Sequence, residues 1–91
     1  MNNNVEKFKE LANTIAETYE RKNADYGNSF EKSLDKFGLV AAAVRIGDKV
    51  NRFENLIDKE NLVKDESISD TLLDLATYAL MTAMYIETKK E

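Results

Sequence analysis

The 91-residue sequence contains no cysteine, histidine, tryptophan or proline. Without cysteine and histidine it can form neither disulfide bonds nor zinc sites built from these ligands, and it has no Ser–His or Cys–His catalytic pair. A metal site would have to use oxygen ligands, which favour Mg²⁺, Mn²⁺ or Ca²⁺. Glycine occurs only three times. An all-β protein of this size needs more turn residues, so the composition favours an all-α fold.

The chain also lacks an excess of positive charge and a long apolar run. It has 17 acidic and 13 basic residues and a net charge of −4. Proteins that bind duplex nucleic acid are normally basic, so this partner is disfavoured. No run approaches the roughly 18 apolar residues of a membrane span, and no signal peptide precedes the first expected helix. We therefore expect a cytoplasmic protein without a membrane partner.

The size predicts one modest core. At 10.4 kDa, scaling relations give a folded surface of roughly 5,400 Å² and burial of about 64% of the unfolded surface. Hydrophobic residues make up 43% and charged residues 33% of the chain, which are near globular averages. We expect a single all-α domain over residues 1–91.

Apolar periodicity in the first half predicts one long helix and one short one. The first helix is expected over about residues 4–23, with Asn2–Asn4 as capping residues. A loop is expected over 22–28. Ser29 is then expected to cap a short helix that Gly38 ends. The apolar positions of the two helices are Val5, Phe8, Ala12, Ile15, Tyr19, Phe30, Leu34 and Phe37.

The second half predicts two further long helices. The third has a bundle-like seam with a 4-3-4-3-4 spacing, formed by Leu39, Ala43, Ile46, Val50, Phe53 and Ile57. A charged connection spans 58–65, and Asp65 or Ser67 is expected to cap the fourth helix, which runs to about Thr88. From Leu72 to Ile86 this helix is apolar on nearly every side. A chain of this size can hardly surround such a helix, so we expect a homo-oligomer buried through it.

Acidic residues of the fourth helix form the first candidate site. Asp74 is the only charged residue between Thr71 and Ile86, and a carboxylate in a buried helix needs a cation as partner. Asp70 lies one turn earlier on the same face, and Glu66 one turn before that. Asp70, Asp74, Thr77 and Met81 fall within a stripe roughly 60° wide. The pair can share a divalent cation; the alternative is a structural ion pair inside an oligomer interface.

Cations of the third helix form the second candidate site. Arg45, Lys49 and Arg52 recur at i, i+4 and i+7 on a face expected to point away from the seam, with Asp48 among them. They can clamp phosphates, because arginine offers bidentate donors and lysine a point charge. The alternative is a solvated face of Asp48–Arg52 pairs.

The third candidate is the loop that follows Lys22. Tyr26 can stack on a base, while Asp25 and Asn28 can hydrogen-bond to its edge. The alternative is an ordinary turn between helices, because asparagine, aspartate and glycine favour turns.

Three motifs in order carry a family resemblance: Asn23-Ala24-Asp25-Tyr26-Gly27, then residues 45–52, then residues 70–80. Over about residues 20–86 the chain resembles the first nucleotide-modification-associated domain family. That family is common in phages and is similar to the MazG-like all-α nucleotide pyrophosphatases. The resemblance implies an oligomeric helical bundle that binds a nucleotide near the third and fourth helices, with Mg²⁺ in the catalytic relatives.

The acidic motifs depart from the MazG-like pattern of E-x-x-E on one helix and E-x-x-D on the next. The corresponding positions read Asp48-x-x-Asn51 and Thr71-x-x-Asp74, with Asp70 and Glu66 nearby. Stabilising Mg²⁺ usually takes several oxygen ligands, so nucleotide recognition carries over better than hydrolysis does.

Three functions follow from these observations. The first is a nucleotide-binding protein that uses Lys22, Asp25, Tyr26, Asn28, Arg45, Lys49 and Arg52, and that could sequester an immune signalling nucleotide in the cytoplasm of a phage-infected cell. The second is a Mg²⁺-dependent nucleoside triphosphate pyrophosphohydrolase with Asp48, Glu66, Asp70 and Asp74 at the metal. The third is a structural interaction module.

Overall fold

The computed structural model describes residues 2–23, 26–58 and 65–89, and the side chains of residues 3–23, 28–58 and 68–89. Four helices account for nearly all of these residues, and the described ranges contain no strand. The prediction of an all-α fold is therefore confirmed. The helices are α1 (Asn2–Lys22), α2 (Tyr26–Phe37), α3 (Val40–Asp58) and α4 (Asp65–Lys89).

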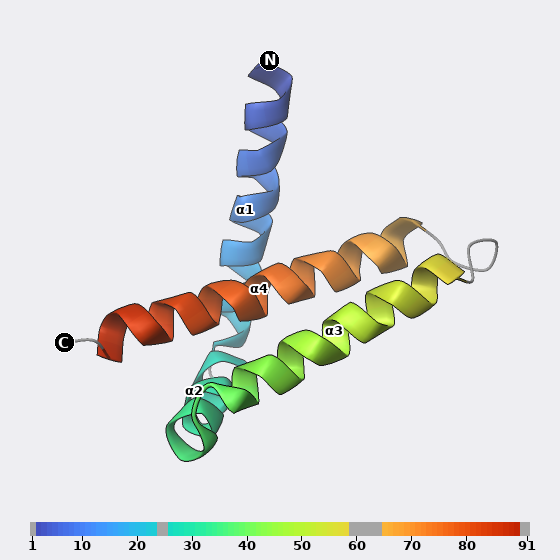
Figure 1. Cartoon of the computed structure of the whole chain (residues 1–91). Coiled ribbons are helices and arrows are strands. Elements are labelled where there is room, and N and C mark those ends of the chain that lie inside the picture. Colours follow the sequence, from blue (N-terminus) through green and yellow to red (C-terminus); the bar gives the residue numbers. More distant parts are fainter. Residues whose placement is uncertain (1, 24–25, 59–64, 90–91) are drawn as a thin grey trace.

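The helices form a packed pair with two attachments (Figure 1). α3 and α4 run side by side in opposite directions, and α2 packs below the start of α3. α1 crosses α4 steeply, and its N-terminal half projects beyond the other helices. Within the described ranges, no helix combines the length and apolarity needed to cross a membrane.

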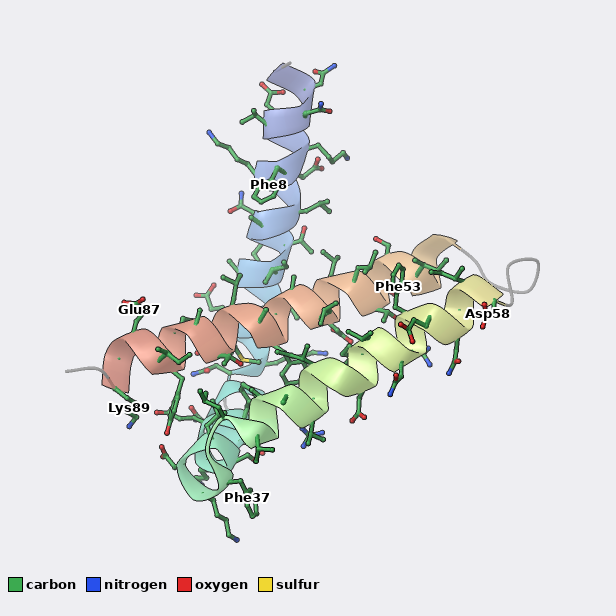
Figure 2. All side chains as sticks on the ribbon, in the orientation of Figure 1. Phe8, Phe37, Phe53, Asp58, Glu87 and Lys89 are labelled. Carbon is green, nitrogen blue, oxygen red and sulfur yellow. The ribbon has the colours of Figure 1, made fainter. Side chains whose placement is uncertain are left out.

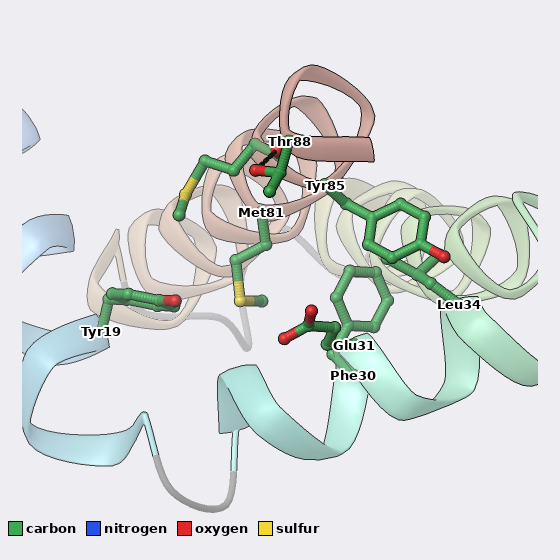
Figure 3. Close-up of a pocket in the computed structure, with 8 residues that line it drawn as sticks. Tyr19, Phe30, Glu31, Leu34, Met81, Tyr85 and Thr88 are labelled. Atoms are coloured by element: carbon green, nitrogen blue, oxygen red, sulfur yellow. Dashed lines mark hydrogen bonds between the residues drawn. The ribbon is translucent and has the colours of Figure 1, made fainter. Parts of the chain in front are cut away.

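The core lies where α2, α3 and α4 meet. Its buried side chains are Phe30, Leu34, Ala42 and Met81. Tyr78 meets Phe30 edge to face, with ring centroids 5.0 Å apart, a favourable aromatic geometry. Figure 3 shows Met81 reaching from α4 between Tyr19 of α1 and Phe30 of α2. The core thereby joins α1 to the rest of the chain through Tyr19, in the last turns of that helix.

Two predicted helix starts are wrong by a few residues. α1 begins at Asn2, so Asn3 and Asn4 lie within it and do not cap it. α2 begins at Tyr26, three residues before Ser29, and the loop is shorter than expected. The N–H groups of a first helical turn have no partner within the helix and must find one outside it. The backbone N–H of Asn28 donates to the carbonyl of Asn23 at 2.9 Å and closes the turn.

Gly38 ends α2 as predicted. Its φ of 77° lies in the left-handed region, which glycine adopts without steric penalty. Its backbone N–H donates to the carbonyl of Leu34 at 2.8 Å, as in a left-handed helix cap. Because the chain turns here, Phe37 points away from the core and is 61% exposed, although it was expected on the apolar face.

The predicted seam of α3 is correct in its middle and wrong at its ends. Ile46, Val50 and Phe53 are half-buried. Leu39, Ala43 and Ile57 are exposed, and Ala42 is buried instead. The turn at Gly38 and Leu39 sets the rotation with which α3 enters the core, and this places Ala42 toward Met81. Helical periodicity alone does not fix that rotation.

The folded chain is open. Its accessible surface is 7026 Å², about 1,600 Å² more than the scaling relation predicts for its mass. Its radius of gyration is 14.7 Å, against roughly 12 Å for a compact domain of this length. α4 contributes to this surface, because four of its large apolar side chains remain exposed: Leu72, Leu80, Met84 and Ile86.

Candidate functional site

A pocket of about 360 Å³ lies between the second half of α1 and the first half of α4. We call it the polar pocket, because charged and hydroxyl side chains dominate its walls. It is lined by Thr14, Ile15, Thr18, Arg21, Lys22, Asp70, Leu73, Asp74 and Thr77.

The α1 wall of the polar pocket carries hydroxyl groups followed by cations. Thr14, Thr18, Arg21 and Lys22 stand at i, i+4, i+7 and i+8, which places them on one helix face. A guanidinium N–H (Nη2) of Arg21 donates to Oγ1 of Thr18 at 3.4 Å. In the last turn of a helix, cations also interact favourably with the helix dipole. This wall therefore presents two positive charges beside each other, one of them linked to a hydroxyl.

The α4 wall carries the predicted carboxylate stripe. Asp70, Asp74 and Thr77 all line the polar pocket, whereas Met81 extends the stripe into the core. Thr77 is 4% exposed and donates through Oγ1 to the carbonyl of Leu73 at 2.8 Å. The expectation that these side chains share one face is confirmed.

Asp74 of α4 forms an ion pair with Lys49 of α3. Nζ of Lys49 lies 3.2 Å from Oδ2 of Asp74. The side chains are 27% and 48% exposed, respectively. Asp74 was expected to be buried, and it is half-exposed because α3 covers only one side of it. Lys49 was expected to point away from the seam, and it reaches α4 instead.

The structure separates the other two cations of α3 from this pair. Arg45 lines a different hollow, together with Phe37, Val40 and Val44. Arg52 is exposed. Lys49 is the only one of the three that forms an ion pair with a carboxylate within the described residues.

Asp48 stands apart from the carboxylates of α4. It is exposed on α3, and within the described part of the chain no ion pair joins it to Arg52. Among the same residues there is no group of three or more histidine, cysteine, aspartate or glutamate side chains placed to hold a metal ion. Among the described residues, Asp70 and Asp74 are the carboxylates that the polar pocket offers to a ligand.

Several predicted positions fall outside the described residues. These are Asp25 and the side chains of Tyr26 and Glu66. Lys22 lines the polar pocket, and Asn28 is exposed in the first turn of α2. The segment predicted to recognise a base therefore begins directly after a residue of the polar pocket.

Sequence reasoning missed Thr14, Thr18 and Arg21 as site residues. Their common helix face could have been found from their spacing. The crossing of α1 over α4, however, depends on Tyr19 packing into the core, and the spacing contains no information on that contact.

The model of the nucleotide modification associated domain 1 family matches residues 22–86. This is well over half of the chain, and the chain belongs to that family. Comparison with curated proteins and with solved structures finds no match. The matched region contains Lys22, Lys49, Asp70 and Asp74, and it begins directly after Arg21. The α4 wall of the polar pocket therefore lies in the family region, whereas most of the α1 wall precedes it.

Proposed function

We propose that this protein binds a phosphorylated nucleotide in the polar pocket. The observation that carries the proposal is the charge around the pocket. Arg21 and Lys22 on one wall face Asp70 and Asp74 on the other, and Lys49 already pairs with Asp74. Because Lys49 neutralises Asp74, the charged lining residues without an ion pair in the described part of the chain are Arg21, Lys22 and Asp70. Two cations thus stand against one carboxylate, although the net charge of the chain is −4. Membership of a nucleotide-modification-associated family supports a nucleotide as the ligand.

Each wall offers a different part of the recognition chemistry. Arg21 can donate two parallel hydrogen bonds to a phosphate, and Lys22 adds a point charge. The hydroxyl group of Thr18 can donate to a phosphate oxygen, whereas that of Thr14 already donates to the carbonyl of Glu10 at 3.1 Å. The carboxylate of Asp70 can accept hydrogen bonds from sugar hydroxyls or a base amino group. The phosphates are therefore assigned to Arg21 and Lys22 at the end of α1, and no longer to Arg45 and Arg52 of α3.

The base remains assigned to the segment after Lys22. Asp25, Tyr26 and Asn28 keep the roles that their chemistry suggests, namely stacking and hydrogen bonding at the base edge. The proposal extends to sequestration: a protein that holds a signalling nucleotide intact in the cytoplasm of an infected cell would act as a phage-encoded sponge against immune signalling.

A Mg²⁺-dependent pyrophosphohydrolase of MazG type is the second candidate. It is favoured by the presence of Asp70 and Asp74, one turn apart, in the same pocket as the proposed phosphate ligands. Mg²⁺ is commonly bound through one or two carboxylates together with substrate phosphates. In this function Asp70 and Asp74 would hold the ion, Glu66 would be a further ligand, and the ion would stabilise charge on the phosphates and activate water.

One experiment separates the two candidates. The protein is incubated with a panel of nucleoside triphosphates and cyclic dinucleotides in the presence of Mg²⁺, re-isolated, denatured and analysed by chromatography. Ligand recovered intact supports binding alone, whereas a nucleoside monophosphate with pyrophosphate supports the enzyme. If no nucleotide is retained or converted, both candidates fail and a structural interaction module is left.

The matched control is a pair of arginine variants. Arg21→Ala should abolish retention of the nucleotide, whereas Arg52→Ala, which removes an exposed arginine outside the polar pocket, should leave it unchanged. If the Arg21→Ala variant still retained the nucleotide, the phosphates would bind outside the polar pocket.

A further inference from the structure

We propose that a second copy of this chain packs the N-terminal half of its α1 into an apolar groove between α1 and α4, and that the contact is reciprocal. The proposal does not depend on the bound ligand. It rests on an unpartnered apolar stripe, on a groove that continues the stripe, and on the area that the single chain leaves exposed.

The stripe lies on the projecting half of α1. Val5, Phe8 and Leu11 are 55%, 76% and 41% exposed. Phe8 stands well clear of the other helices in Figure 2. Helix periodicity places Val5 and Phe8 on the face that carries Ile15 and Tyr19 further along. The first half of this face has no covering helix within the described chain, and the second half meets α4.

The groove begins where the stripe reaches α4. It has a volume of about 270 Å³. Two of its α4 side chains, Leu80 and Met84, are 53% and 49% exposed. The lining is otherwise apolar except at Tyr19 and Thr77: Ala12, Ile15, Ala16, Tyr19, Thr77, Leu80, Met81 and Met84. It is a surface onto which an apolar helix face can pack.

Stripe and groove on one face make the surface self-complementary. A two-fold axis near Ala12 lays the projecting stripe of each copy over the groove of the other. In such an isologous contact, each residue that meets a groove residue has its symmetric counterpart, and the assembly closes at two copies. Two-fold symmetry requires a surface that fits a copy of itself. The projecting half of α1 and the groove beside α4 together form such a surface.

The single chain leaves a large area exposed. The whole chain exposes about 1,600 Å² beyond the surface expected for its mass, and each partner in a standard-size interface buries roughly 800 Å². Five of the exposed large apolar side chains that the structure describes lie on the stripe or in the groove: Val5, Phe8, Leu11, Leu80 and Met84. The charges beside the stripe do not oppose pairing. Glu6, Lys7, Lys9 and Glu10 balance in sign, and Nζ of Lys7 lies 3.1 Å from Oε1 of Glu10.

Pairing places the partner beside the polar pocket. Ile15 and Thr77 line both the groove and the polar pocket, so a helix seated in the groove lies at the edge of that pocket. The expectation of an oligomer is thereby kept, with α1 and one edge of α4 as the contact surface.

A second exposed apolar patch provides the control. Phe37, Val40 and Val44 are 61%, 61% and 58% exposed where α2 meets α3. Figure 2 shows Phe8 and Phe37 at opposite ends of the molecule. This patch has no projecting helix that could fill the corresponding hollow of another copy.

The test compares two matched phenylalanine variants by light scattering at micromolar concentration. The unaltered protein should have twice the 10.4 kDa mass of one chain. Phe8→Asp should halve the mass and retain the helical signal in circular dichroism, because Phe8 makes few contacts within its own chain. Phe37→Asp should leave the doubled mass unchanged. A monomeric parent protein, or dissociation by Phe37→Asp and not by Phe8→Asp, would overturn the proposal.

Cross-linking decides the matter if Phe8→Asp fails to fold. The chain has no cysteine, so single-cysteine copies carry one reactive group each. A Val5→Cys copy mixed with a Met84→Cys copy should give a cross-linked heterodimer with a short bifunctional maleimide, because the two-fold axis lays Val5 over the end of the groove lined by Tyr19 and Met84. A Phe37→Cys copy in place of the Val5→Cys copy should give none. Equal yields from the two mixtures would refute the α1 contact.

Discussion

The α3–α4 pair and the N-terminal half of α1 differ in what their apolar faces meet. Each of these helices has apolar residues at helical spacing. In the pair, Ala42 and Met81 belong to a buried cluster, and Lys49 and Asp74 form an ion pair. Along α1, Val5 and Phe8 remain exposed. Periodicity therefore specifies that a helix has an apolar face, and the arrangement of the chain decides whether that face is covered.

This difference has energetic consequences. Full burial of a large apolar side chain contributes about 1.5–3 kcal/mol to stability. Leu34 receives that contribution within the single chain, because it is 2% exposed. Phe8 receives little of it until a partner covers it. The core region should therefore govern folding, and the α1 stripe should govern association.

The largest effect is expected for Leu34→Ala. The substitution leaves a cavity among Phe30, Ala42 and Met81 and should lower the free energy of unfolding by about 2–5 kcal/mol. Urea denaturation followed by circular dichroism measures the change. Leu39→Ala, at a position 53% exposed, is the matched control, and its effect should stay within about 0.5 kcal/mol. Similar losses in both variants would contradict the location of the core.

The next effect concerns the proposed ligand. Arg21→Ala should weaken nucleotide binding about tenfold or more, because charge-assisted hydrogen bonds are each worth roughly 1.5–3 kcal/mol and 1.4 kcal/mol is a factor of ten. Isothermal titration provides the affinities. Binding should also weaken as salt is added, since part of the attraction is Coulombic. If the affinity depended neither on salt nor on Arg21, Arg21 would not bind the ligand, and its interaction with the helix dipole would be its remaining role.

A smaller effect is expected for the ion pair. Asp74→Ala removes the partner of Lys49 and should lower the free energy of unfolding by up to about 1 kcal/mol, because both side chains are partly exposed to solvent. Folding should persist, unlike the outcome expected for a fully buried carboxylate. A double-mutant cycle with Lys49→Ala isolates the pair, and Asp48→Ala is the control on the exposed side of α3. A cycle without coupling would mean that the contact adds nothing to stability.

The smallest effect is expected at alkaline pH, on the stability of the fold. The hydroxyl of Tyr85 donates to Oδ1 of Asp35 at 2.7 Å, and this hydrogen bond to the carboxylate raises the pKa of Tyr85 above 10.0. The folded state thus favours the protonated tyrosine. Its contribution to stability is complete below pH 10 and is lost as the pH rises through the folded-state pKa.

Tyr85→Phe isolates that contribution. Denaturation at a series of alkaline pH values should show a steeper loss of stability in the parent protein than in the variant. Titration of tyrosinate absorbance gives the pKa itself. Parallel stability curves would exclude a role for the Asp35–Tyr85 bond.

Much of the secondary structure was predictable from local patterns. Gly38 ends α2 because only glycine adopts its φ of 77° at low cost. The carboxylate stripe of α4 was predictable too, because Asp70 and Asp74 are one helical turn apart. By contrast, the helix starts near Asn2 and Tyr26 were missed. The N–H groups of a first turn can be satisfied by side chains, by water or by nearby backbone, so several neighbouring residues can begin a helix.

The candidate site was only half predictable. The sequence indicated Asp70, Asp74 and Lys22, and it grouped Lys49 with Arg45 and Arg52 by spacing. It could not show that Lys49 alone of these three contacts Asp74, because the rotation of α3 is set by the turn at Gly38 and the docking of Ala42. It also could not show that Arg21 faces α4.

By itself, the sequence determined the all-α class, the four helices, the absence of thiol and imidazole chemistry, and the family. These depend on composition, on short-range periodicity and on motifs in order. The tertiary structure alone decided which helix faces meet: α1 crosses α4 and forms the polar pocket, while its own apolar stripe stays exposed. Such contacts are made by side chains that are far apart in the sequence, and the packing of these side chains sets the rotation and crossing angle of each helix. Local sequence patterns therefore do not predict them.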